Sequence, residues 1–159
     1  MSRPQRHFAM RKQTQANAVL PKFWRPKVSA SVRTTVQIIH WDLVNRMAEG
    51  SATTEDLWDW IETGFTYSQM ANLLAADGVE FDSEAMAAIA AQLDIYQSVT
   101  NRLRKTGRIG FDAEELRVAR AAANVMDALI ELDRHGIAER AAIWSVEQMA
   151  SIRRRAAAA

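Results

Sequence analysis

After residue 28, apolar residues recur at intervals of three and four along most of the chain, which is the period of one face of an α-helix. The first stripe runs from about Ser31 to Gly50. Its members are Val32, Val36, Ile39, Leu43 and Met47. We expect this face of the helix to lie in the core.

A second helix begins after Thr53, since Thr53 followed by Asp56 three residues later has the pattern of a capping box. Its apolar stripe reaches Gly64, and Thr66 with Gln69 then repeats the pattern. Two interpretations remain open. Either a new helix begins at Thr66, or the first continues through Gly64 at a cost of about 1 kcal/mol.

Two long helices follow. Asp82 or Ser83 caps one that ends in a basic turn before Gly107, and its apolar stripe consists of Met86, Ile89, Leu93, Tyr96, Val99 and Leu103. Asp112 with Glu115 opens the other, which we expect to end at Gly136. Its stripe consists of Leu116, Ala119, Ala123, Met126 and Ile130.

The last helix has a weaker stripe, made of Ile137, Ala141, Trp144, Gln148 and Ile152. No segment alternates apolar and polar residues as a strand does. We therefore predict an all-α fold, a five- or six-helix antiparallel bundle, because the connections at 50–53 and 107–112 are short.

All three prolines lie within the first 26 residues, where they oppose helix formation. The predicted division is a basic, extended N-terminal arm over residues 1–28, a helical bundle domain over 29–155 and a disordered alanine tail over 156–159.

Charge is segregated along the chain, although the formal net charge is only +1. Residues 1–41 contain eight Lys/Arg and no carboxylate, whereas residues 42–100 contain eleven carboxylates and one arginine. Four cations follow in residues 101–110, and the remainder is nearly neutral. The arm is therefore a cation and the middle of the chain is an anion.

The 159 residues contain no cysteine, which excludes disulfides, thiolate metal sites and cysteine nucleophiles. No apolar run approaches the roughly 18 residues of a membrane span, and the first thirty residues lack the apolar core of a signal peptide. We expect a cytoplasmic protein that does not contact membranes.

No motif points to catalysis, a metal or a cofactor. The three histidines are not spaced as ligands, and no glycine-rich phosphate loop occurs. We expect His135 to complement a helix C-terminus and His40 to pack at the surface. The acids Asp56, Asp59, Glu62, Glu80, Asp82 and Glu84 fit helix starts and solvated faces better than an acid–base pair.

The segment from Thr66 to Leu93 resembles a helix-turn-helix, with the small residue Ala71 and a glycine turn. The outward side of its second helix has no Lys or Arg to meet phosphates. Two ordinary packed helices are therefore the favoured interpretation.

The arm is the better candidate for nucleic-acid binding, since aromatic rings alternate with cations in residues 22–27. The candidate contacts are Arg3, Arg6, Arg11, Lys12, Lys22, Phe23, Trp24, Arg25, Lys27, Arg102, Arg104, Lys105 and Arg108. Two alternatives stay open: the arm docks in an acidic protein groove, or it folds back on the chain's own acidic segment.

A second candidate surface contains Trp58, Trp60, Asp59 and Glu62. The two tryptophans lie about 200° apart on a helical wheel, so we expect one of them to be exposed or at an interface. This surface would bind a protein.

Short motifs extend over roughly residues 22 to 150: K-F-W-R-P-K, E-G-S-A-T-T-E-D-L-W, M-A-N-L-L and R-K-T-G-R-I-G-F-D-A-E-E-L. Together they resemble a family of small uncharacterised proteins of proteobacterial prophages and plasmids. The resemblance implies a mobile element and a non-enzymatic accessory role there, either on its DNA or against a host defence complex. It carries over no functional residue.

Two hypotheses follow. The first is a non-enzymatic mobile-element accessory protein that binds nucleic acid through the arm. The alternative is an inhibitor or adaptor that binds a host protein complex through the acidic, Trp-bearing helices. An enzyme is a third alternative for which no site assembles, and a homo-oligomer is compatible with each.

Overall fold

The computed structural model describes residues 27–158, apart from the side chain of Ala156. It contains the helices α2 (Ala30–Glu49), α3 (Thr54–Ala76), α4 (Ser83–Thr106), α5 (Ala113–Glu131) and α6 (Ile137–Ala158), and no strand within the described range. The all-α prediction is confirmed. Residues 1–26 of the predicted arm lie outside the described range, whereas residues 156–158 belong to α6 and not to a separate tail.

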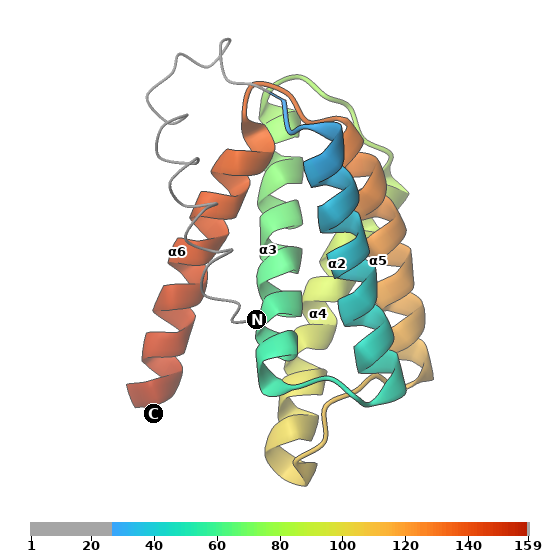
Figure 1. Ribbon diagram of the computed structural model, residues 1–159, viewed down its shortest axis with the longest axis vertical. Coiled ribbons are helices and arrows are strands. Elements are labelled where there is room, and N and C mark those ends of the chain that lie inside the picture. The colour runs from blue at the N-terminus through green and yellow to red at the C-terminus, as the bar shows by residue number, and fades with distance from the viewer. Residues whose placement is uncertain (1–26, 159) are drawn as a thin grey trace.

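Successive helices alternate in direction, as Figure 1 shows from α2 to α6. Helix α3 is central, because it contacts each of the other four. The antiparallel bundle is therefore confirmed. Its core lies around α3, where Trp60 packs edge-on between Tyr96 of α4 and Phe111, with ring centroids 4.6 and 5.0 Å away.

Helix α3 runs without a break through Gly64, which settles the question that the sequence left open. Thr53 and Asp56 form the predicted capping box, but the Thr66 hydroxyl donates to the Glu62 carbonyl inside the helix. Of the two interpretations, the continuous helix through Gly64 is the correct one. Gly64 is needed there because a Cβ at this position would lie 1.4 Å from Oη of Tyr96.

The predicted core stripe of α2 is partly wrong. Val32 and Ile39 are 43% and 47% exposed, and the buried residues of the helix are His40, Leu43, Val44 and Met47. Helix α2 lies at the periphery and packs mainly against α3 and α5. That contact is a narrow seam, so the flank carrying Val32 and Ile39 faces outward.

Helix α5 ends at Glu131, five residues before the predicted end at Gly136. In the turn that follows, the buried Asp133 carboxylate accepts hydrogen bonds from the backbone N–H groups of Val28 and Ala138, each 2.8 Å long. Asp133 therefore ties the start of α6 to the segment that leads into α2. For the Asp133 carboxylate to reach both N–H groups, the chain has to leave the helical conformation before Asp133.

His135 lies in the same turn with a φ of +53°. Its Nδ1 is 3.1 Å from Oδ2 of Asp77, the residue that ends α3. The prediction that this imidazole complements the end of its own helix is wrong, because α5 ends at Glu131 and the imidazole contacts the side chain of Asp77 instead. The buried seam of α6 is made of Ile137, Ala138, Ala141, Ser145 and Met149, so the predicted members Trp144 and Gln148 lie at its edge.

Candidate functional site

An apolar groove lies over one face of α3, between the C-terminal halves of α4 and α6. We call it the α3 groove. It measures about 490 Å³, within the range of protein binding sites. It is lined by Thr54, Leu57, Trp58, Ile61, Phe65, Tyr96, Gln97, Thr100, Leu103, Arg104 and Ile152. The floor comes from α3, because residues 54, 58, 61 and 65 share one face of that helix.

The groove exists because α4 and α6 both pack against α3 while their C-terminal ends lie apart, at the same end of the bundle (Figure 1). Phe65 and Trp144 close the upper part of the gap, with ring centroids 6.5 Å apart. Below them, Leu103 of α4 and Ile152 of α6 form the two walls. An apolar surface is therefore left partly open to solvent.

Trp58 is the largest side chain of the groove and is only partly buried. The guanidinium carbon of Arg153 lies 5.6 Å from the centroid of its ring, within the range of a cation–π contact. Trp60 is fully buried. Of the two tryptophans, one of which we expected to be exposed or at an interface, Trp58 is thus the more exposed, and Trp60 is not available to a partner. Asp59 and Glu62, named with it, are partly buried.

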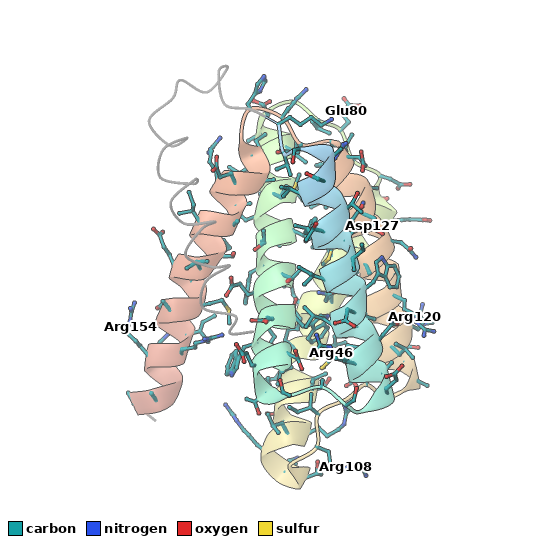
Figure 2. All side chains as sticks on the ribbon, in the orientation of Figure 1. Arg46, Glu80, Arg108, Arg120, Asp127 and Arg154 are labelled. Atoms are coloured by element: carbon teal, nitrogen blue, oxygen red, sulfur yellow. The ribbon has the colours of Figure 1, made fainter. Side chains whose placement is uncertain are left out.

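The rim of the groove is basic. Arg104 lines it, and Lys105 and Arg108 follow at the exposed end of α4. Arg153, Arg154 and Arg155 are exposed at the end of α6. Figure 2 shows Arg108 and Arg154 in the half of the molecule that contains the groove. Two cationic segments that are far apart in the sequence thus lie in the same half of the molecule. Each lies where the negative end of a helix dipole favours cations.

Arg102 has a different role from its neighbours. Its guanidinium binds the Glu115 carboxylate with two bonds of 2.8 and 2.9 Å and donates to the Gly110 carbonyl at 2.6 Å. Burial works to raise the pKa of the Glu115 carboxyl, but hydrogen bonds from Arg102, Ser98 and the backbone of Asp112 outweigh it and lower that pKa. As a candidate contact for nucleic acid, Arg102 is therefore unsuitable, because it holds the start of α5.

The arm candidates Arg3, Arg6, Arg11, Lys12, Lys22, Phe23, Trp24 and Arg25 lie outside the described residues. Lys27 is described, and its Nζ donates to the carbonyl of Glu131 at the end of α5. The end of α5 lies at the opposite end of the bundle from the groove (Figure 1). The structure therefore does not bring Lys27 near Arg104, Lys105 and Arg108.

His40 is buried, contrary to the expectation that it packs at the surface. Burial lowers the pKa of its imidazole to about 4. Among the described residues, neither ring nitrogen has a hydrogen-bond partner. The neighbouring Trp41 donates from Nε1 to Asp127 at 2.8 Å instead. Polar residues are rarely buried without partners, so the sequence offered no signal for this position.

The segment from Thr66 to Leu93 is part of two long antiparallel helices. Gly64 of α3 lies against Tyr96 of α4, and near the turn Leu74 and Ile89 share one apolar cluster. These contacts extend along both helices, whereas a helix-turn-helix crosses two short ones. The interpretation as ordinary packed helices is confirmed.

The acidic residues that we weighed as an acid–base pair have structural roles where the contacts are clear. The buried Asp56 caps α3 and lies 3.0 Å from the guanidinium of Arg46, and Asp82 caps α4. In the described part of the chain, no three His, Asp or Glu side chains are grouped as metal ligands. No helix described here is both long enough and apolar enough to cross a membrane.

Comparison of the chain with protein-family models, with curated proteins and with solved structures finds no match.

Proposed function

We propose that this chain is a non-enzymatic binding protein that holds a partner protein in the α3 groove. The observation that carries the proposal is the apolar groove itself, with the partly exposed Trp58 at its centre and arginines at its rim. A groove with an apolar lining can hold the apolar face of a protein segment. Tryptophan and arginine are also the residues that contribute most to protein interfaces.

The chemistry of the groove favours protein over nucleic acid. Its walls are the aliphatic side chains of Leu103 and Ile152, and the ring of Trp58 is already contacted by Arg153. Nucleic-acid sites present free aromatic faces to bases and dense cations to phosphates. Residues 29–159 contain thirteen Lys/Arg against nineteen Asp/Glu, so the bundle as a whole repels a polyanion.

Nucleic acid is the second candidate partner, in keeping with the accessory role that the sequence suggests. The observation in its favour is the cluster of exposed cations at the ends of α4 and α6. Residues 1–28 add seven Lys/Arg. In this alternative, phosphates contact both segments, and the groove itself stays empty.

A matched pair of variants tests the proposal. Tagged chain is recovered from proteobacterial cells, the hosts that the resemblance implies, with and without nuclease treatment. The groove variant is Ile152→Glu, and the control is Ile38→Glu, at a position of α2 that is 64% exposed. We expect a protein that copurifies with the wild type and with Ile38→Glu, survives nuclease and is lost with Ile152→Glu.

Two results would contradict the proposal. In one, the same proteins copurify with Ile152→Glu as with the wild type, so the groove does not hold them. In the other, nuclease treatment removes all copurifying material, which would leave nucleic acid as the partner. Circular dichroism of the three proteins checks that each substitution leaves the helical fold intact.

A further inference from the structure

We propose that the occupant of the α3 groove is an amphipathic α-helix of the partner, with an apolar stripe flanked by acidic residues. This inference rests on the proposed function and specifies the partner at the same site. It follows from the shape of the groove, the distribution of charge along its rim and the composition of the chain itself.

The shape of the groove fits a helix. Three helices bound it, with α3 as the floor and α4 and α6 as the sides. A groove between two helices on a third is the usual site at which an amphipathic helix inserts its apolar face. The floor extends from Thr54 to Phe65, which is about 16 Å at 1.5 Å per residue. An occupant of about three turns matches this length.

The lining indicates an apolar stripe on the side of the occupant that enters the groove. Leu57 and Ile61 of α3 and Tyr96 of α4 are buried in the lining, and Trp58 and Phe65 of α3 are partly exposed. Apolar residues spaced three and four apart on the occupant would contact this surface along its length. A single extended strand would present only alternate residues, and its backbone groups would lack partners against these side chains.

The rim indicates acidic flanks. Arg104 of α4 lies on one side, and Arg153 of α6, which contacts the Trp58 ring, lies on the other. Both side chains are exposed, and neither forms an ion pair with another described residue. A helix in the groove would therefore have an arginine at each of its two edges. Carboxylates of the occupant at these edges would be attracted by the arginines of the rim, whereas lysines would be repelled.

The same argument disfavours two other occupants. Residues 1–28 of this chain contain seven Lys/Arg and no carboxylate, so the basic rim repels them. A second copy of the chain would have to offer an exposed apolar helix face. The best one is on α2 around Ile38 and Ile39, where the neighbouring Asp42 is already paired with Arg46. Neither segment has the acidic flanks that the rim fits.

The test is a selection from a displayed library of helix-forming peptides of about 14 residues, randomised at every position and applied to the full chain. Three proteins serve as bait: the wild type, the double variant Arg104→Glu/Arg153→Glu, and Arg120→Glu. Arg120 is an exposed arginine of α5 on the far side of the bundle from α6, as Figure 2 shows, and it controls for net charge.

We expect the wild type and Arg120→Glu to select peptides with apolar residues three and four apart and Asp or Glu at the flanking positions. A synthetic peptide of that consensus should bind the double variant at least tenfold more weakly, and the double variant should select Lys and Arg flanks instead. Adding salt should weaken binding to the wild type, because part of the attraction is between exposed charges.

The inference is overturned if the wild type selects peptides without acidic flanks, or if the double variant binds the acidic consensus as well as the wild type does. It is also overturned if a peptide of residues 1–28 displaces the consensus, or if the chain forms a dimer that Ile152→Glu dissociates. Each of these results leaves the copurification experiment free to succeed. The two experiments together therefore distinguish a groove that binds another kind of protein segment from a groove that binds no protein.

Discussion

The packing of Tyr96 of α4 against α3 depends on the absence of a side chain at Gly64. The Tyr96 hydroxyl occupies the space that a Cβ would fill and accepts a 2.9 Å hydrogen bond from Gln92. Glycine costs about 1 kcal/mol relative to alanine inside a helix, so its presence at the centre of α3 requires such a reason. That reason lies in α4, far away in the sequence, and the local pattern could not reveal it.

Gly64→Ala therefore reduces stability although it improves helix propensity. Overpacking a core costs about 1–3 kcal/mol, which exceeds the gain in propensity. Urea unfolding followed by circular dichroism should show a lower midpoint. In the Tyr96→Phe background the loss should be smaller, because the closest atom is gone. A midpoint that rises in both backgrounds would show that Tyr96 does not pack here as described.

His40 makes stability depend on pH. The unfolded chain binds a proton at a pKa near 6.5, whereas burial lowers the pKa of the folded imidazole to about 4. Between these values the unfolded state carries more protons, so the free energy of unfolding falls as pH falls, by up to about 3 kcal/mol. Above pH 6.5 the imidazole is neutral in both states and contributes no pH dependence.

Replacement of His40 by Phe tests this assignment. Urea unfolding at pH 7 and at pH 4.5 should show a smaller loss of stability for His40→Phe than for the wild type. The carboxylates titrate in both proteins and cancel in the comparison. Equal losses would mean that His40 is protonated in the folded state.

At the scale of the helices, the caps were readable from the sequence and the exact packing seams were not. The boxes at Thr53 and Asp112 form as predicted, because a cap needs only residues within one turn. The seam of α2 and the end of α5 differ from expectation, since both depend on neighbours that are remote in sequence. The apolar spacing of Val32 and Ile39 correctly predicted a helix. It did not show which other helices would pack beside that helix.

Two neighbouring arginines of α4 should differ in their effect on stability: Arg102 has a structural role, whereas Arg104 has a binding role. Arg102→Met leaves the buried Glu115 carboxylate without its guanidinium partner, and we expect a loss of about 2–3 kcal/mol. Arg104→Met, at an exposed position, should cost less than about 0.5 kcal/mol. Thermal unfolding of the two variants measures the difference, and equal effects would contradict the role given to Arg102.

At the scale of the whole molecule, the sequence identified Trp58, Arg104, Lys105 and Arg108 as binding residues but not as one site. Trp58 belongs to α3, and the cations lie in α4 or just after it. Of the α6 residues at the groove, Ile152 was expected to be a core residue, and Arg153 was not among the candidates. Only the divergence of α4 and α6 over α3 joins them. The apolar period of a helix does not show how far two helices lie apart. The groove could therefore not be predicted from the sequence.

The segregation of charge along the chain predicts how strongly the protein binds nucleic acid and how that binding depends on salt. Binding through the exposed cations and residues 1–28 should be weak and should fall by about 10³ between 50 and 200 mM salt. Alanine at Arg3, Arg6, Arg11, Lys12, Lys22 and Arg25 should abolish it, whereas Ile152→Glu should not affect it. Fluorescence anisotropy with labelled DNA and RNA measures both. Tight binding that resists salt and disappears with Ile152→Glu would place nucleic acid in the groove instead.

Photocrosslinking from inside the groove tests the central claim most directly. A photoreactive amino acid replaces Gln97, which lines the groove, and in a control chain it replaces Arg120 on α5. After irradiation in cells, the account predicts a crosslinked protein, resistant to nuclease, from position 97 and none from position 120. Crosslinks to nucleic acid alone, or the same products from both positions, would contradict it.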